Sequence, residues 1–204
     1  MPIEYSSADR TFFLHAGEAT YAMKVLTHGF LAHLYWGKKI ATQELDFVLQ
    51  LRERAFSPNP DGLGKEFSLD TLPLEYPVYG STDFRSPALE IFQPEDGSRI
   101  VDLRFKNYRI LDGKPALSGL PSTWIEHESE AQTLIVELED AKLGLRVELS
   151  YSAFADQPRD HTVGAHSASG KDFSRYPASV VLLRGLCFQP DQLAFSASFR
   201  SPPS

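Results

Sequence analysis

The chain has 204 residues, of which 42% are hydrophobic and 23% are charged, and its formal net charge is -7. This length suits one large domain or one and a half small ones, and the apolar fraction excludes a wholly disordered chain. The single cysteine, Cys187, excludes a disulfide framework and a cysteine-based zinc site, and the acidic balance argues against a nucleic-acid partner. No apolar stretch approaches the roughly 18 residues of a membrane span. Residues 1–10 are polar and lack the apolar core of a signal peptide, so we expect a cytoplasmic protein without a membrane partner.

Alternation of apolar and polar residues predicts an all-β fold, an antiparallel sandwich. In chain order, the predicted strands are Tyr21–Val25, Gly29–Trp36, Val101–Lys106, Thr133–Glu139 and Leu143–Tyr151. The connection Asp140–Lys142 is short enough for an antiparallel hairpin. Residues 44–54 carry apolar side chains at intervals of three to four and predict one short helix, although clear capping residues are lacking.

The segment Ala55–Pro87 contains five prolines, which cannot donate to a strand ladder. A long irregular segment of this kind inside a domain favours a functional loop. It is also rich in aromatic residues, so two interpretations stand side by side. One is a surface loop pinned by its rings, and the other is a loop that faces a partner or a ligand.

The residues alone predict no catalytic centre and no cofactor. Gly62-Leu63-Gly64 lacks the lysine and hydroxyl residue of a phosphate-binding loop, and no serine lies in a nucleophile elbow. The six histidines are dispersed, so no metal site is predicted. Glu126, His127, Glu128 and Glu130 form a charged cluster that we interpret as a solvated turn face.

Several ordered segments nevertheless resemble the start of a bacterial family 36 α-galactosidase. Those up to Pro87 are Gly29–Lys38 (GFLAHLYWGK), Arg54–Pro60 (RAFSPNP), Phe67–Pro73 (FSLDTLP), Glu75–Pro77 (EYP), Tyr79–Gly80 (YG) and Thr82–Pro87 (TDFRSP). The segments Gly113–Leu117 (GKPAL), Gly119–Pro121 (GLP) and Glu126–Glu128 (EHE) continue the resemblance, which extends to about Asp156.

This resemblance implies a glycosidase with an N-terminal β-supersandwich, a central (β/α)₈ barrel and a C-terminal β-domain. In the family, two aspartates of the barrel carry out a retaining hydrolysis of terminal α-galactosides of the melibiose or raffinose type. The present chain matches the first part of the supersandwich, so we expect it to contain neither catalytic aspartate and to be inactive alone.

The resemblance also implies a homotetramer in which an acidic residue reaches the active site of a neighbouring subunit and binds the sugar. The matching position is Glu53, where the family usually has aspartate. A carboxylate suits this role because it accepts two hydroxyl hydrogen bonds. The alternative interpretation is that Glu53 is an exposed partner of Arg52 or Arg54.

Composition changes abruptly after Gln157. Residues 1–157 hold 24 acidic and 15 basic residues, whereas residues 158–204 hold three and five, with eight serines and no glutamate. We therefore divide the chain into a partial supersandwich domain (1–157) and an out-of-frame or disordered tail (158–204).

The hypothesis of a frameshift depends on codons in the tail. The codons of residues 161–166 read one base later permit Arg-Ser-Val-Arg, and those of residues 183–187 permit Ser-Val-Asp-Phe. Both are expected in the family, in that order. A nucleotide sequence without these motifs in the shifted frame would refute the hypothesis.

A second function remains open beside the α-galactosidase fragment. The chain could be a non-catalytic β-sandwich module that binds sugar or assembles oligomers. A groove of Tyr35, Trp36 and Trp124 could stack on a sugar ring, although aromatic residues in strands more often belong to the core.

Overall fold

The computed structural model describes residues 2–41, 45–53, 55–56, 58–60, 62–93, 96–115 and 125–154, and the backbone of 163–166 and 182–183. These residues form strands and irregular segments, with one short 3-10 helix, η1 (Glu128–Glu130). The strands are β1 (Ile3–Ser6), β2 (Thr11–Ala16), β3 (Ala19–Val25), β4 (Leu31–Lys38), β5 (Leu89–Glu90), β6 (Arg104–Asp112), β7 (Ala131–Asp140), β8 (Leu145–Phe154), β9 (Val163–His166) and β10 (Leu182–Leu183). Within the described ranges, no helix has the length and apolar character needed to cross a membrane.

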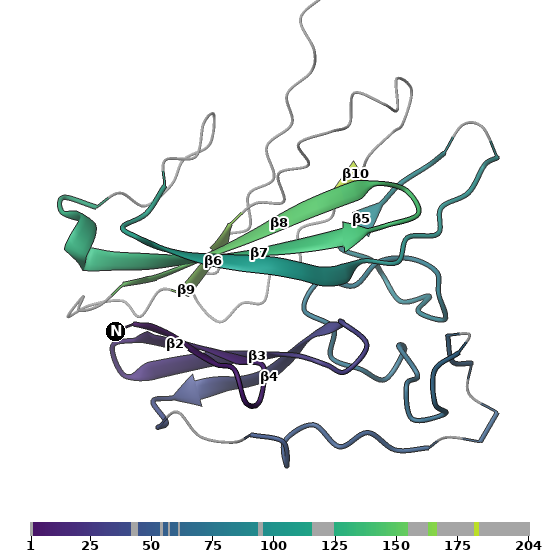
Figure 1. Cartoon of the computed structure of the whole chain (residues 1–204), viewed down its shortest axis with the longest axis horizontal. Helices are drawn as coiled ribbons and strands as arrows, with labels where there is room; N and C mark the ends of the chain where they lie inside the picture. The colour runs from purple at the N-terminus through teal and green to yellow at the C-terminus, as the bar shows by residue number, and fades with distance from the viewer. Residues whose placement is uncertain are drawn as a thin grey trace, which may run out of the picture.

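Two four-stranded sheets form the two layers of the fold (Figure 1). One has the order β1-β2-β3-β4 and the other β6-β7-β8-β9, and neighbouring strands are antiparallel in both. A separate antiparallel pair joins β5 and β10. The predicted all-β antiparallel sandwich is confirmed.

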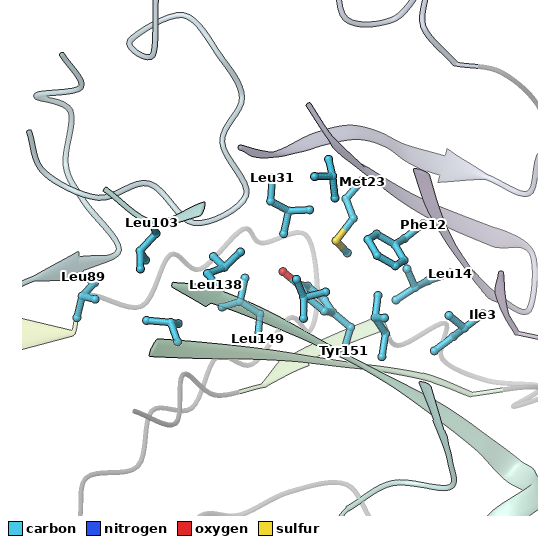
Figure 2. Packing of buried hydrophobic residues seen from close by; sticks show 14 of the residues in the cluster. Ile3, Phe12, Leu14, Met23, Leu31, Leu89, Leu103, Leu138, Leu149 and Tyr151 are labelled. Atoms are coloured by element: carbon cyan, nitrogen blue, oxygen red, sulfur yellow. The ribbon is translucent and has the colours of Figure 1, made fainter. Parts of the chain in front are cut away.

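The main hydrophobic core lies between the two sheets. Figure 2 shows Phe12, Leu14 and Met23 of the first sheet facing Leu138, Leu149 and Tyr151 of the second. Burial of a large apolar side chain contributes about 1.5–3 kcal/mol, so this layer is the main source of stability. The opposite face of the first sheet is also covered, because Phe13, Ala22 and Leu34 pack there against Leu45.

The predicted hairpin of β7 and β8 is confirmed, with Ala131 opposite Phe154 and Asp140 opposite Leu145. Its turn is closed by buried Asp140, whose Oδ1 accepts hydrogen bonds from the backbone N–H of Lys142 (2.9 Å) and Leu143 (3.1 Å). Gly144 follows with φ +65°, a conformation that favours glycine. Oδ2 of Asp140 also accepts the N–H of Asp102 at 2.8 Å, so this side chain joins the hairpin to the chain that enters β6.

The sequence missed two strands of the first sheet and misplaced a third strand. β1 and β2 were not predicted. Five of the six β2 residues are buried, on both faces, so the sequence of β2 does not alternate. The predicted strand Val101–Lys106 is displaced, because Val101 and Leu103 are buried before the strand and β6 begins at Arg104.

The predicted helix over residues 44–54 is wrong where the chain is described. Residues 46–48 form a turn and residues 50–53 have no regular structure. Leu45 is buried whereas Val48, three residues later, is 42% exposed, so the apolar residues do not share one buried helical face. Residues 42–44 and 54 lie outside the described residues.

The predicted tail, residues 158–204, is described only at β9 and β10. β9 pairs with β8, with Ser150 opposite His166, and β10 pairs with β5. The remainder, including Cys187, lies outside the described residues, and the frameshift hypothesis stays a prediction.

Candidate functional site: the loop that carries Glu53

Glu53 lies on an irregular segment that follows β4 and is anchored at its start by apolar side chains. Leu45 is 3% exposed and packs against Phe13, Ala22 and Leu34, and Leu49 lies partly buried beside the same cluster. The carbonyl of Leu45 accepts the N–H of Val48 at 3.0 Å, which closes a turn. The segment therefore leaves the sheet from a fixed point.

A second anchor follows Glu53, at Pro58–Pro60. The hydroxyl of buried Ser68 donates to the carbonyl of Pro58 at 3.1 Å. The side-chain amide of Asn59 donates to the carbonyl of Leu63 at 3.0 Å. Pro60 is buried, and its ring restricts the backbone, so Glu53 lies between two held ends.

Between these anchors, the side chains of residues 50–53 and 55–56 face solvent. Glu53 is exposed and so is Arg52, whose Nη2 donates to Oε1 of Gln50 at 2.7 Å. This contact directs the Arg52 guanidinium to Gln50. Arg54, the other candidate partner of Glu53, lies outside the described residues, and no finding tests the predicted role of Glu53.

Exposed apolar side chains surround Glu53 in the sequence. Phe47 is 69% exposed and Phe56 is fully exposed, and Val48 and Leu51 are exposed as well. Large apolar side chains gathered on a loop are typical of an interaction surface. Of the two interpretations of the proline-rich segment, Phe56 fits the loop that faces a partner, whereas buried Phe67 pins the segment to the domain.

The 80–85 turn supports the same region through an ion pair between buried Asp83 and half-exposed Arg85. Asp83 is 1% exposed, and its carboxylate accepts Nε (2.9 Å) and Nη2 (2.7 Å) of Arg85. Nη2 also donates to the carbonyls of Leu69 (2.8 Å) and Leu72 (3.0 Å). The hydrogen bonds from Arg85 to Asp83 raise the pKa of the guanidinium, although its partial burial opposes this. The Arg85 guanidinium thus links the 80–85 turn to residues 69–72, which directly follow Ser68.

This turn is conformationally strained. Ser81 and Thr82 have φ +49° and +83°, and the backbones of Gly80 and Asp83 exchange two hydrogen bonds of 2.9 Å. Glycine and asparagine usually occupy such positions, and a β-branched threonine is disfavoured there. The Asp83–Arg85 pair holds the chain in this conformation.

A carboxylate between the sheets was not predicted. Glu75 accepts a hydrogen bond from the hydroxyl of Tyr151 on β8 at 2.8 Å, and a second, short one from Tyr21 on β3. Burial, and next the negative charge of Glu75, raises the pKa of both tyrosines well above its usual value. Glu75 therefore connects the two layers, and its partners are 54 and 76 residues away in sequence.

The cluster at Glu126 is an exposed turn, as interpreted from the sequence. Oε1 of Glu130 accepts the N–H of His127 at 3.0 Å, and Oε2 accepts that of Glu126 at 3.3 Å. Ligand atoms of these three residues lie within 4.8 Å of one another. The carboxylate of Glu130 is already occupied as the cap of η1, so its arrangement has a structural explanation.

The predicted groove of Tyr35, Trp36 and Trp124 is wrong in one respect. Tyr35 packs with Phe13 and Ala22 on one face of the first sheet, whereas Trp36 contacts Tyr21 on the other. Trp124 lies outside the described residues.

Comparison with known proteins identifies the family. The family described as "Glycosyl hydrolase family 36 N-terminal domain" matches residues 29–159. The chain is 49% identical over 154 residues to Alpha-galactosidase AgaA of Geobacillus stearothermophilus, covering 76% of this chain and 21% of that protein.

Solved structures agree with the sequence comparison. The crystal structure of the α-galactosidase AgaB from Geobacillus stearothermophilus is similar with a TM-score of 0.70 and 50% identity, over 76% of this chain and 21% of that one. The crystal structure of an AgaA variant from the same organism, in complex with raffinose, is similar with a TM-score of 0.67 and 50% identity. This match covers 71% of the present chain and 20% of the variant. The chain thus spans about a fifth of the length of these relatives. It belongs to glycosyl hydrolase family 36, and its residues 29–159 match the N-terminal domain of that family.

Proposed function

We propose that the chain is an N-terminal fragment, with part of the β-domain, of an α-galactosidase that hydrolyses terminal α-D-galactosyl residues of melibiose- or raffinose-type sugars with retention of configuration. The relatives matched here are named α-galactosidases, and one relative's structure contains raffinose. The role of the domain in that enzyme is to assemble subunits and to present Glu53 to the active site of a neighbour. The observation that carries this role is the exposed carboxylate of Glu53 between two anchored loop ends and beside exposed Phe47 and Phe56.

The loop suits a function across a subunit interface. Its ends are fixed by Leu45 and by the Ser68–Pro58 hydrogen bond, so little conformational entropy is lost when it meets a partner. Its exposed apolar side chains would be buried in an oligomer, and Glu53 would then accept hydroxyl hydrogen bonds from the sugar. Glutamate is one methylene longer than the aspartate usual in the family, which extends its reach.

We further propose that these 204 residues have no activity alone, because the family resemblance assigns both catalytic aspartates to the barrel. Purified chain should release no more nitrophenol from p-nitrophenyl α-galactoside than a blank without protein. Circular dichroism in the same sample should show β-structure, so that the result refers to folded protein. Turnover that persists after a second purification would contradict the assignment of catalysis to the barrel.

A further inference from the structure

A partly exposed group of polar and aromatic side chains surrounds Tyr21, which packs against the core between the sheets. Trp36 on β4 is 41% exposed, and its ring lies 5.7 Å from that of Tyr21 at an interplanar angle of 64°. The His33 ring lies 5.1 Å from the same tyrosine, and the carboxylate of Glu75 accepts its hydroxyl. His33 and Glu75 are both partly exposed. Trp36, His33 and Glu75 are therefore gathered around one ring.

A β-bulge in β4 brings His33 and Trp36 together. Ala22 lies opposite Tyr35, and the next residue of β3, Met23, lies opposite His33. Leu34 is therefore an extra residue in β4 with no partner in the register. Leu34 and Tyr35 consequently face the other side of the sheet, and His33 and Trp36, three residues apart, both contact Tyr21. Bulges often redirect side chains next to binding sites.

The polar groups of this cluster retain hydrogen-bonding capacity. A carboxylate offers about four acceptor positions. Two of those on Glu75 are occupied, by Tyr21 and Tyr151, and in the described part of the chain no cationic side chain forms an ion pair with it. Within the same described part, neither ring nitrogen of His33 makes a hydrogen bond. In the described part of the chain, unused acceptor positions of Glu75 and an imidazole without a hydrogen bond thus lie around the same tyrosine as a partly exposed indole.

We propose that Trp36, His33 and Glu75 form a non-catalytic binding site for one pyranose ring of a neutral saccharide. The C–H face of the sugar packs on the indole of Trp36, its hydroxyl groups donate to Glu75, and His33 forms a further hydrogen bond. Tyr21 and Tyr151 hold the carboxylate in place, so the site is organised before the ligand arrives.

The test is a titration of the full chain with D-galactose, D-glucose and raffinose. The chain has two tryptophans, Trp36 and Trp124, so Trp124→Phe leaves the proposed site as the sole source of indole fluorescence. We expect a saturable change in that variant with a dissociation constant on the order of 1 mM for at least one sugar. Calorimetry on Trp36→Ala should show affinity at least tenfold weaker, and Trp36→Phe should restore part of it. Glu75→Gln should also bind more weakly, since one oxygen acceptor is replaced by a donor.

Phe84→Ala is the matched control, because Phe84 is an exposed aromatic residue at another position. The affinity of this variant for the sugar should equal that of the unsubstituted chain. The absence of saturation up to about 100 mM of every sugar with folded protein would overturn the proposal. Saturable binding that Trp36→Ala leaves unchanged would also overturn it, as would binding of tetramethylammonium without binding of sugar. This site is separate from Glu53, so its failure would leave the proposed role in α-galactoside hydrolysis untouched.

Discussion

Replacement of Glu75 by alanine is expected to lower the free energy of unfolding by about 3 kcal/mol, because a hydrogen bond to a charged group contributes about 1.5–3 kcal/mol and Glu75 accepts two. The loss would leave the hydroxyls of Tyr21 and Tyr151 without this acceptor inside the molecule, and Tyr151 is 3% exposed. The connection between β3 and β8 would be lost with it. Equilibrium unfolding in urea, followed by tryptophan fluorescence, measures the change.

Glu148→Ala is the matched control for Glu75→Ala. Glu148 pairs with Arg109 at 2.9 Å across the outer face of the second sheet, where both side chains are partly solvated. Such a pair contributes at most about 1 kcal/mol. Equal losses in the free energy of unfolding for the two variants would show that the Glu75 carboxylate stabilises the fold no more than a surface ion pair does.

The tyrosines around Glu75 also predict the response to alkaline pH. Burial raises the pKa of Tyr76 to about 12, and burial and Glu75 raise those of Tyr21 and Tyr151. A raised pKa in the folded state means that the unfolded state loses its proton first. The stability is thus complete below pH of about 10 and falls as the pH rises toward 12. Glu75→Ala should weaken this dependence, because it removes the charge that opposes ionisation of Tyr21 and Tyr151.

The second large effect is expected for Asp83→Ala, which should cost about 2 kcal/mol. The buried Asp83 carboxylate accepts three hydrogen bonds from Arg85, and a hydrogen bond that involves a charged group contributes about 1.5–3 kcal/mol, while the half-exposed guanidinium can be solvated after the substitution. Arg85 would lose its carboxylate, and the carbonyls of Leu69 and Leu72 would be held less firmly. The strained backbone at Ser81–Thr82 would also lose the contact that maintains it. Urea unfolding measures the stability, and limited proteolysis should show faster cleavage within residues 62–85.

Arg146→Ala serves as the control for Asp83→Ala. Arg146 reaches Glu139 at 3.2 Å and Glu137 at 3.7 Å, but its side chain is 60% exposed. Its loss should change the free energy of unfolding by about 1 kcal/mol or less. If Asp83→Ala behaved in the same way and kept its resistance to protease, the ion pair would not be the support of this loop.

The fold class followed from strands that bury one face. The hairpin of β7 and β8 could be predicted because Val147 and Leu149 alternate with exposed or partly exposed residues and Asp140 begins a short turn. β2 could not be predicted in this way, because both of its faces are covered and its sequence is a largely apolar run without alternation. β6 was misplaced because it is largely exposed and a bulge between Phe105 and Asn107 interrupts its alternation.

The functional residues divide in a similar way. Glu53 was a candidate because a family resemblance marks its position, and the structure adds that it is exposed on an anchored loop. The cluster around Glu75 depends on tyrosines 54 and 76 residues away, which no local pattern brings together. The pairing of His33 with Trp36 required a bulge, whereas simple alternation places residues 33 and 36 on opposite faces.

The proposed role of this domain in an α-galactosidase is tested most directly in a chimera. Residues 1–157 would replace the matching segment of Alpha-galactosidase AgaA, which is 49% identical over 154 residues. We predict that the chimera hydrolyses raffinose and that Glu53→Ala raises its KM about 10- to 100-fold, as expected for the loss of hydrogen bonds to a charged group. Glu148→Ala should leave the KM unchanged. A folded chimera that is inactive, or an active one whose KM is unaffected by Glu53→Ala, would contradict the account.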